Sequence, residues 1–190
     1  MYYIYMEYLT EIAIRILQVV PHGLSKVKFA KTIYFVHKQL VKNFNREVTD
    51  MGFIRMPLGP VPDGFMKLDT TEIEIVHVQN ELSFDSQVYK CSNVYFEDTL
   101  QGHVDKIVKG LNKFTTYDLV DISHCEPSWI NHHNGEKYFL TEEDLKTVFP
   151  KANLERRNHS FSDQNLQAKL VEGMLNDIVE ESTLLEYPDS

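Results

Sequence analysis

Apolar side chains recur every three or four residues over long stretches of this chain, and the spacing predicts helices. The clearest stretches cover about residues 7–19, 25–43 and 100–111, since residues three and four apart share one helix face. Pro21 and Gly23 end the first helix, and the hydroxyl of Ser25 can cap the second. The second helix has two neighbouring apolar stripes, so we expect it at the centre of the core.

One segment changes to the two-residue period of a β-strand. Residues 71–78 are rich in β-branched side chains that partly alternate with polar ones. Residues 79–81 suit a turn, and residues 82–84 and 88–89 can return as the second arm. We therefore expect one β-hairpin or small antiparallel sheet here.

The stretch from Asn45 to Pro62 carries five glycine and proline residues, which are turn and boundary signals. We do not expect a regular helix in it. Pro60 or Pro62 can open a short helix that reaches about Leu68, because proline is tolerated in the first helical turn.

The last third contains shorter elements. A threonine-capped helix is predicted over about 116–124, and Thr141 with three acidic residues behind it resembles another helix start. Residues 151–162 are polar and suit a linker. Residues 163–182 have apolar positions spaced by four and acidic residues between them, which predicts an amphipathic helix.

The elements add up to an α+β fold that is predominantly helical. We expect a compact helical domain with one small antiparallel β element over residues 1–150, followed by the linker and C-terminal helix over 151–190. An apolar fraction of 43% and an aromatic fraction of 12% are enough for a real core and argue against disorder.

Charge and cysteine content narrow the choice of partners. The formal charge is −9, with +3 in the first 50 residues and −12 in the remainder, which argues against a nucleic-acid partner. The start lacks the basic region of a signal peptide, and no apolar run approaches the roughly 20 residues that span a bilayer. Two cysteines without CxxC spacing fit a reducing compartment. We expect a cytoplasmic protein without a membrane partner.

A metal site is the first chemical hypothesis to weigh. His124, Cys125, His132 and His133 fall within ten residues and are all zinc-ligand types, so a metal-dependent hydrolase is one alternative function. The recognised spacings CxxC and HExxH are absent, which favours a histidine at a helix end and two exposed loop histidines instead. Neither Cys125 nor Cys91 stands in a local nucleophile signature.

A DNA-binding regulator acting through the first two helices is a second alternative. The second helix carries five lysines that are spread around it and do not gather on one face, so we expect a solvated helix surface. These are Lys26, Lys28, Lys31, Lys38 and Lys42.

Two blocks of the sequence together resemble the Panacea domain of SocA-like antitoxins. The first block is Lys31-Thr32-Ile33-Tyr34-Phe35-Val36-His37, then Leu40, Val48-Thr49, Phe53 and Gly59-Pro60-Val61-Pro62. The second is Leu119-Val120-Asp121-Ile122-Ser123-His124, then Glu126 and Trp129. The resemblance covers roughly residues 7–148. The stretch from Glu72 to Tyr95 and the tail beyond Pro150 match no pattern of the family.

The resemblance implies a mainly helical domain with a small β element, and the antitoxin role in a bacterial or phage toxin–antitoxin pair. It implies no enzymatic activity and no cofactor. The implied partner is a cognate toxin encoded by the adjacent gene, and a protease can join where the antitoxin acts as an adaptor. The implied motif or partner-binding residues are Lys31, Tyr34, His37, Phe53, Gly59, Pro60, Val61, Pro62, His124 and Trp129.

Overall fold

The protein is described by a computed structural model that covers residues 2–44, 51–68, 71–79, 85–92 and 94–147. The α-helices are α1 (Tyr2–Val19), α2 (Lys26–Phe44), α3 (Thr99–Leu111), α4 (Thr116–Ser123), α5 (Pro127–Asn131) and α6 (Glu142–Lys146), with a short 3-10 helix, η1 (Phe65–Lys67). The strands are β1 (Leu24–Ser25), β2 (Phe53–Met56), β3 (Gly59–Pro62), β4 (Ile73–Gln79), β5 (Asp85–Cys91) and β6 (Lys137–Tyr138).

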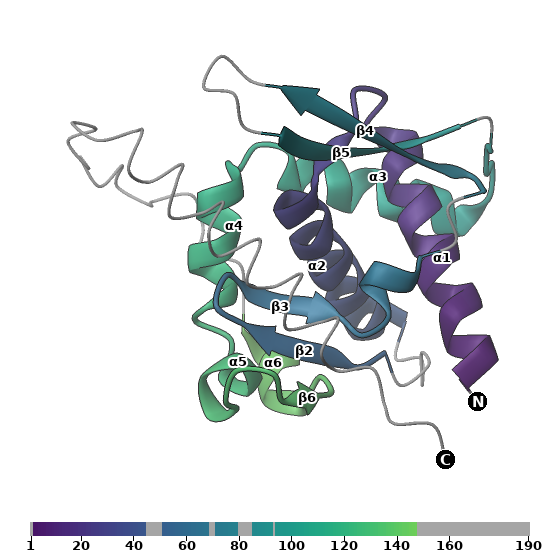
Figure 1. The fold of residues 1–190 in the computed structure, drawn as a ribbon. Helices are drawn as coiled ribbons and strands as arrows, with labels where there is room; N and C mark the ends of the chain where they lie inside the picture. Colours follow the sequence, from purple (N-terminus) through teal and green to yellow (C-terminus); the bar gives the residue numbers. More distant parts are fainter. Residues whose placement is uncertain (1, 45–50, 69–70, 80–84, 93, 148–190) are drawn as a thin grey trace.

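The strands form two antiparallel sheets of three strands each, with orders β1-β5-β4 and β3-β2-β6. Figure 1 shows the two sheets on opposite sides of α2, which contacts strands of both. The prediction of a predominantly helical fold with one small β element is therefore wrong. The fold is α+β, and α2 is its central element.

The missed sheet begins in the stretch that its glycines and prolines marked as irregular. Gly59 adopts φ +92°, which closes the turn between β2 and β3. The amide of Asp63 donates to the carbonyl of Gly52 at 3.0 Å, so alternate residues of β3 bond to β2. Pro60 and Pro62 take the outward positions between them, where a strand needs no donor toward its neighbour. Prolines two residues apart are thus compatible with an edge strand.

The other local predictions agree more closely. The predicted hairpin is β4–β5, with the short β1 added beside β5, and its turn lies outside the described residues. The predicted helices over 7–19, 25–43, 100–111 and 116–124 correspond to α1, α2, α3 and α4.

Two predictions at the ends of elements need correction or stay open. The short helix near Leu68 is η1, which begins after Gly64 and not at a proline. The predicted linker and helix over 151–182 lie outside the described residues. None of the described helices is long and apolar enough to cross a bilayer.

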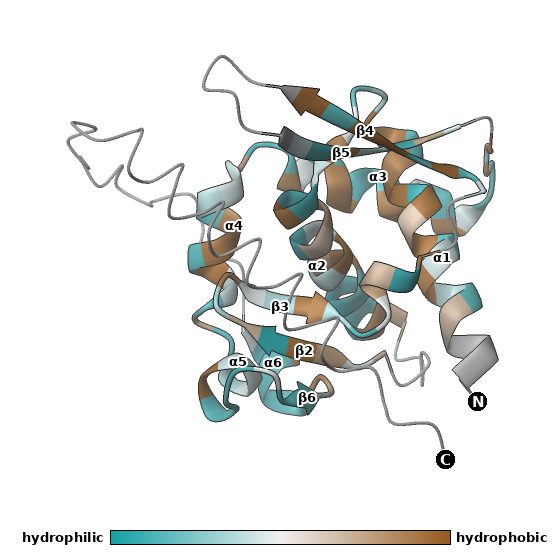
Figure 2. Ribbon diagram, in the orientation of Figure 1, coloured by the Kyte–Doolittle hydropathy of each residue, from teal (hydrophilic) through white to brown (hydrophobic). Residues whose placement is uncertain are grey.

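Apolar residues of α1, α2 and α3 meet in one core, and Figure 2 shows apolar and polar positions alternating along these helices. Phe29 of α2 packs against Tyr89 of β5 and Phe65 of η1, with ring centroids 5.2 and 5.6 Å away. On the side of α2 that faces the second sheet, the core also contains charged side chains. They are Lys31, Lys38 and Glu126, which lie within or beside the two motif blocks, and Asp144 of α6.

Candidate functional site

Lys31 occupies a tight junction between α2, β3 and α4. Its side chain is 1% exposed, and its Nζ donates to the carbonyl of Pro60 at 2.6 Å. Burial lowers the pKa of the Lys31 ammonium well below its usual range. A Cβ on Gly59 would collide with the hydroxyl of Ser123 and lie 2.9 Å from Cε of Lys31. The three elements can therefore approach this closely only because residue 59 has no side chain.

Lys38 and Glu126 form a second buried junction, between α2 and the residue that precedes α5. Nζ of Lys38 donates to both carboxylate oxygens of Glu126, at 2.7 and 2.6 Å. The Tyr34 hydroxyl donates to the same carboxylate at 3.2 Å, and Oγ1 of Thr147 lies 3.1 Å from it. Burial lowers the pKa of Lys38, and the charge of Glu126 opposes that shift. Pairing is what makes two buried charges tolerable here.

Asp144 connects α6 to α5 from a fully buried position. It accepts hydrogen bonds from the amide of Ser128 at 2.9 Å and from its hydroxyl at 2.5 Å. The same carboxylate closes a capping box with Thr141 at the start of α6. Burial by itself raises the pKa of Asp144, but the hydrogen bonds from Ser128 and Thr141 outweigh it and leave the pKa lowered.

Trp129 joins α5 to the turn between β2 and β3. Its ring stacks on the His124 imidazole, with centroids 4.0 Å apart and planes 16° from parallel, and Cζ of Arg55 lies 4.1 Å from its centroid. The indole Nε1 donates to the carbonyl of Met56 at 3.1 Å. Arg55 continues outward to the side-chain oxygen of Asn134. Burial and the nearby Lys31 charge lower the pKa of His124, which favours the neutral ring in this stack.

An aromatic cluster covers the inner side of β2. Phe53 lies between Tyr34 and His37 of α2, with ring centroids 4.9 and 5.7 Å from theirs. The Nδ1 of His37 is 3.3 Å from the Tyr8 hydroxyl of α1. Because burial costs the charged imidazole its hydration, the pKa of His37 falls to about 4.

The motif residues thus gather where α2 meets the second sheet and the α4–α5 segment. The region unites both sequence blocks, although they are far apart in the chain. Its members are Lys31, Tyr34, His37, Phe53, Gly59, Pro60, Val61, Pro62, His124 and Trp129. Most of them are buried, so they hold elements together and present little surface to a partner.

The sequence did not indicate that two acidic residues, Glu126 and Asp144, anchor this region. Lys31, Tyr34 and Lys38 are spaced by three and four, which places them on one face of α2. That spacing was available as a signal for one polar face. Glu126 stood in the second motif block and Asp144 among the acidic residues that follow Thr141, but nothing local related either of them to α2.

The proposed metal ligands do not come together. His124 stacks on Trp129, while Nδ1 of His132 lies 2.7 Å from the carbonyl of Ser128 and its ring stacks on Tyr138. Cys125 and His133 are both exposed. Across the described ranges, no group of three or more His, Cys, Asp or Glu residues is placed to hold a metal ion. The hydrolase alternative therefore loses the cluster on which it rested.

The lysines of α2 do not form a basic surface either. Lys31 and Lys38 are buried, and Nζ of Lys28 donates to the carbonyl of Phe114 at 2.9 Å. The prediction of a solvated helix surface is wrong for Lys31 and Lys38, because strands and helices surround α2. The DNA-binding alternative loses the same surface.

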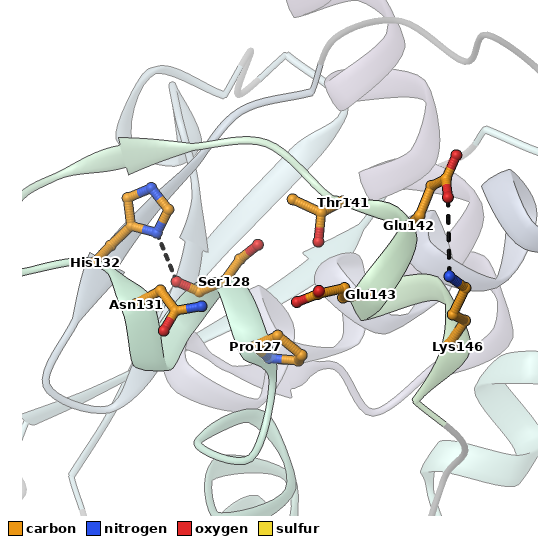
Figure 3. A pocket seen from close by; sticks show the side chains of 8 residues that line it. All are labelled: Pro127, Ser128, Asn131, His132, Thr141, Glu142, Glu143 and Lys146. Carbon is orange, nitrogen blue, oxygen red and sulfur yellow. Dashed lines mark hydrogen bonds and ion pairs between the residues drawn. The ribbon is translucent and has the colours of Figure 1, made fainter.

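A depression of about 460 Å³ lies between α5 and α6. Figure 3 shows it lined by Pro127, Ser128, Asn131, His132, Thr141, Glu142, Glu143 and Lys146. The proximity of Ser128, His132 and Asp144 does not make a nucleophile with its base. The Ser128 hydroxyl donates to Asp144, and the hydrogen bond of His132 goes to the Ser128 backbone. The depression is a surface groove that is lined mainly by polar and charged residues.

A protein-family model described as "Antitoxin SocA-like, Panacea domain" matches residues 29–130, more than half of the chain. The matched range contains both motif blocks and the junctions around Lys31, Glu126 and Trp129. Searches of curated proteins and of solved structures find no match to the chain.

Proposed function

This chain belongs to the family of SocA-like antitoxins with a Panacea domain, and from that premise we propose that it neutralises a toxin by direct protein–protein binding. The match of the family model to residues 29–130 is the observation that carries the proposal. The toxin is the product of the adjacent gene, and the pair acts in the cytoplasm of a bacterium or in a phage-infected cell. No catalytic step and no cofactor belong to this role.

Most of the family-motif residues are buried, so the surface that binds the toxin is formed by other residues. The Lys31 and Lys38 junctions are enclosed, so their role in the proposal is to fix the relative positions of α2, β3 and α5. Toxin binding then falls to exposed side chains that this frame positions. Ile130 follows Trp129 on α5 and is 60% exposed, and Phe139 follows β6 and is 47% exposed. Exposed apolar residues near a polar groove are typical of protein–protein contacts.

We assign the toxin-binding face to α5, α6 and the groove between them. Glu142 and Lys146 form an ion pair at 3.9 Å, so Glu143 leaves the rim of the groove with a net negative charge, and the chain as a whole is acidic. An acidic face attracts a basic partner surface and speeds association at low salt. A toxin that contacts RNA or nucleotides presents such a surface.

The first experiment is genetic. The neighbouring gene is cloned alone and together with the gene for this chain, and growth is measured, followed by affinity capture of the two proteins from the co-expressing cells. The proposal predicts growth arrest by the neighbour alone, rescue by co-expression and a stable complex. A neighbour that is harmless alone, or a rescue without any complex, contradicts direct neutralisation.

The second experiment locates the face. Ile130→Asp places a charge on the α5 part of the proposed contact, and Glu143→Lys reverses a charge on the rim of the groove. Both residues are exposed, so thermal stability should stay within a few degrees of the parent, while rescue is lost or weakened. Glu97→Lys is the matched control, because it makes the same charge change at an exposed position away from α5 and α6. Equal loss of rescue in Glu97→Lys and Glu143→Lys would indicate a general charge effect and contradict the assigned face.

A protease can enter the same scheme without changing the binding step. If the antitoxin is an adaptor, the toxin is degraded in cells that contain both proteins, and its half-life shortens on co-expression. If binding alone neutralises, the toxin accumulates in the complex. Measuring toxin half-life after a block of protein synthesis distinguishes these two forms of the proposal.

A further inference from the structure

The outer face of α3 carries a row of lysines. The inner face of this helix packs against α1 and α2 (Figure 1), and its buried residues are Gln101, Val104, Val108 and Leu111. Lys106 and Lys109 are three residues apart on the opposite face, and Lys113 follows the helix end by two residues. All three lysines are exposed. We call this row of ammonium groups the lysine face.

The charge of the lysine face is largely unbalanced within the described residues. Between residues 102 and 113 there are three lysines and one acidic residue, Asp105, which leaves a net charge of +2. Asp105 lies 3.7 Å from Lys109, whose side chain is still 70% exposed. Lys106 and Lys113 have no ion pair with any residue that the structure describes. The lysine face can therefore bind further carboxylates.

The other exposed lysines of the described ranges lie singly on different elements. They are Lys42 of α2, Lys67 of η1, Lys137 of β6 and Lys146 of α6. Two of these have carboxylate partners, because Lys137 lies 2.6 Å from Asp63 and Lys146 lies 3.9 Å from Glu142. Among the described elements, α3 is thus the one with several exposed lysines in a row.

Complementary charge is concentrated in residues 170–190, which lie outside the described residues. This segment contains six Asp or Glu residues and no Lys, Arg or His. Between Thr147, the last described residue, and Leu170 lie 22 residues. At about 3.3 Å per residue they can span up to about 70 Å, whereas a compact domain of this size has a radius of gyration of about 15 Å. The acidic segment is therefore long enough in its connection to reach α3.

We propose that residues 170–190 of this chain dock on the lysine face of α3, with their carboxylates paired to Lys106, Lys109 and Lys113. A single exposed ion pair is weak, but the covalent connection holds the segment at an effective concentration of about millimolar order, so several weak pairs are sufficient. The docked segment covers the lysine face and keeps nucleic acid and other anions away from it. The contact lies on a different element from the α5–α6 face and does not depend on the proposed antitoxin function.

Carbodiimide cross-linking of the full chain tests the docking, because the reagent joins an amine to a carboxylate only where the two are in contact. A mixture of isotope-labelled and unlabelled protein is cross-linked, and the joined peptides are identified by mass spectrometry. Residues 170–190 should link to Lys106, Lys109 and Lys113 about fivefold more often than to Lys67 or Lys146. These links should join residues of one chain, and they should be lost in about 1 M salt, where the Debye length is about 3 Å.

Two outcomes of the cross-linking would overturn the proposal. Equal yields at all of these exposed lysines would mean that the acidic segment has no preferred face. Links that mainly join a labelled chain to an unlabelled one would mean that the lysine face binds a second copy instead.

A matched pair of double variants gives a second measurement on the full chain. Lys106→Glu/Lys113→Glu reverses two charges of the lysine face, and Lys67→Glu/Lys146→Glu makes the same change at exposed positions elsewhere. A glutamate-specific protease should cleave within residues 170–190 about fivefold faster in the first variant than in the second, because an undocked segment is open to the protease. Thermal unfolding checks that both variants are folded, and the cross-linking of the parent chain decides the question if one is not. Equal cleavage rates in the two variants would contradict docking on α3.

Discussion

Lys38 and Glu126 are 88 residues apart in the sequence, yet Nζ of Lys38 lies 2.6 Å from Oε2 of Glu126 inside the protein. The side chains are 2% and 5% exposed. This ion pair ties the central helix α2 to the start of α5. It is one of several contacts that join the regions of the two motif blocks.

Removal of Lys38 should destabilise the fold strongly. Lys38→Met leaves the Glu126 carboxylate buried without its cation, and breaking such a pair costs about 3–5 kcal/mol. The free energy of unfolding from urea titration measures the effect. Lys109→Met is the control, because Lys109 and Asp105 form an exposed pair at 3.7 Å that contributes little. Similar losses in the two variants would contradict the importance of the buried pair.

Gly59 and Gly102 should respond in opposite directions to the same substitution. Gly59→Ala puts a Cβ against Ser123 and Lys31 at a residue with φ +92°, and we expect a loss of about 2 kcal/mol or more. Gly102 lies inside α3 with no atom within 4 Å of a Cβ, so Gly102→Ala should stabilise by about 0.5–1 kcal/mol. Melting temperatures of the two variants provide the comparison. A harmless Gly59→Ala would mean that α4 does not pack as closely on β3 as described.

Trp129 should contribute through both its ring and its N–H. Trp129→Ala removes the stack on His124 and Arg55, and the expected loss is about 3 kcal/mol. Trp129→Phe keeps an aromatic ring but removes the indole N–H that donates to the Met56 carbonyl, with an expected loss of about 1 kcal/mol. Denaturant unfolding measures both. Unchanged stability combined with lost toxin binding would instead place Trp129 in the interface.

Acid should destabilise the protein through His37. Its pKa is about 4 in the fold, against 6.5 for an ordinary histidine, so the unfolded chain binds a proton more readily between these values. The stabilisation is complete above pH 6.5 and is lost as the pH falls toward 4, by about 3 kcal/mol in total.

His37→Gln isolates this contribution, because glutamine does not titrate. The free energy of unfolding of the parent should fall more steeply than that of His37→Gln between pH 6.5 and 4, and the two curves should run parallel above pH 7. Parallel curves throughout the range would show that His37 is not kept neutral by burial.

The sequence by itself determined much of the local structure. The three- and four-residue spacing of apolar side chains gave the positions of α1 to α4, and β-branched alternation gave the β4–β5 hairpin. These features depend on neighbours within a few turns of chain, so a local pattern is sufficient to predict them. The two motif blocks likewise indicated the family, which the match over residues 29–130 confirms.

Only the tertiary structure decided the second sheet and the burial of the lysines. Pro60 and Pro62 look like turn signals locally, and they are compatible with β3 because the strand lies at an edge with both prolines facing outward. Lys31 and Lys38 likewise look solvated when only the local sequence is considered. Helical periodicity specifies which residues share a face, but it does not specify what covers that face. The carbonyl of Pro60 and the carboxylate of Glu126 offset the loss of hydration, and both come from parts of the chain distant in sequence from these lysines. The cost of burying a charge is met by long-range partners, which a local pattern cannot identify.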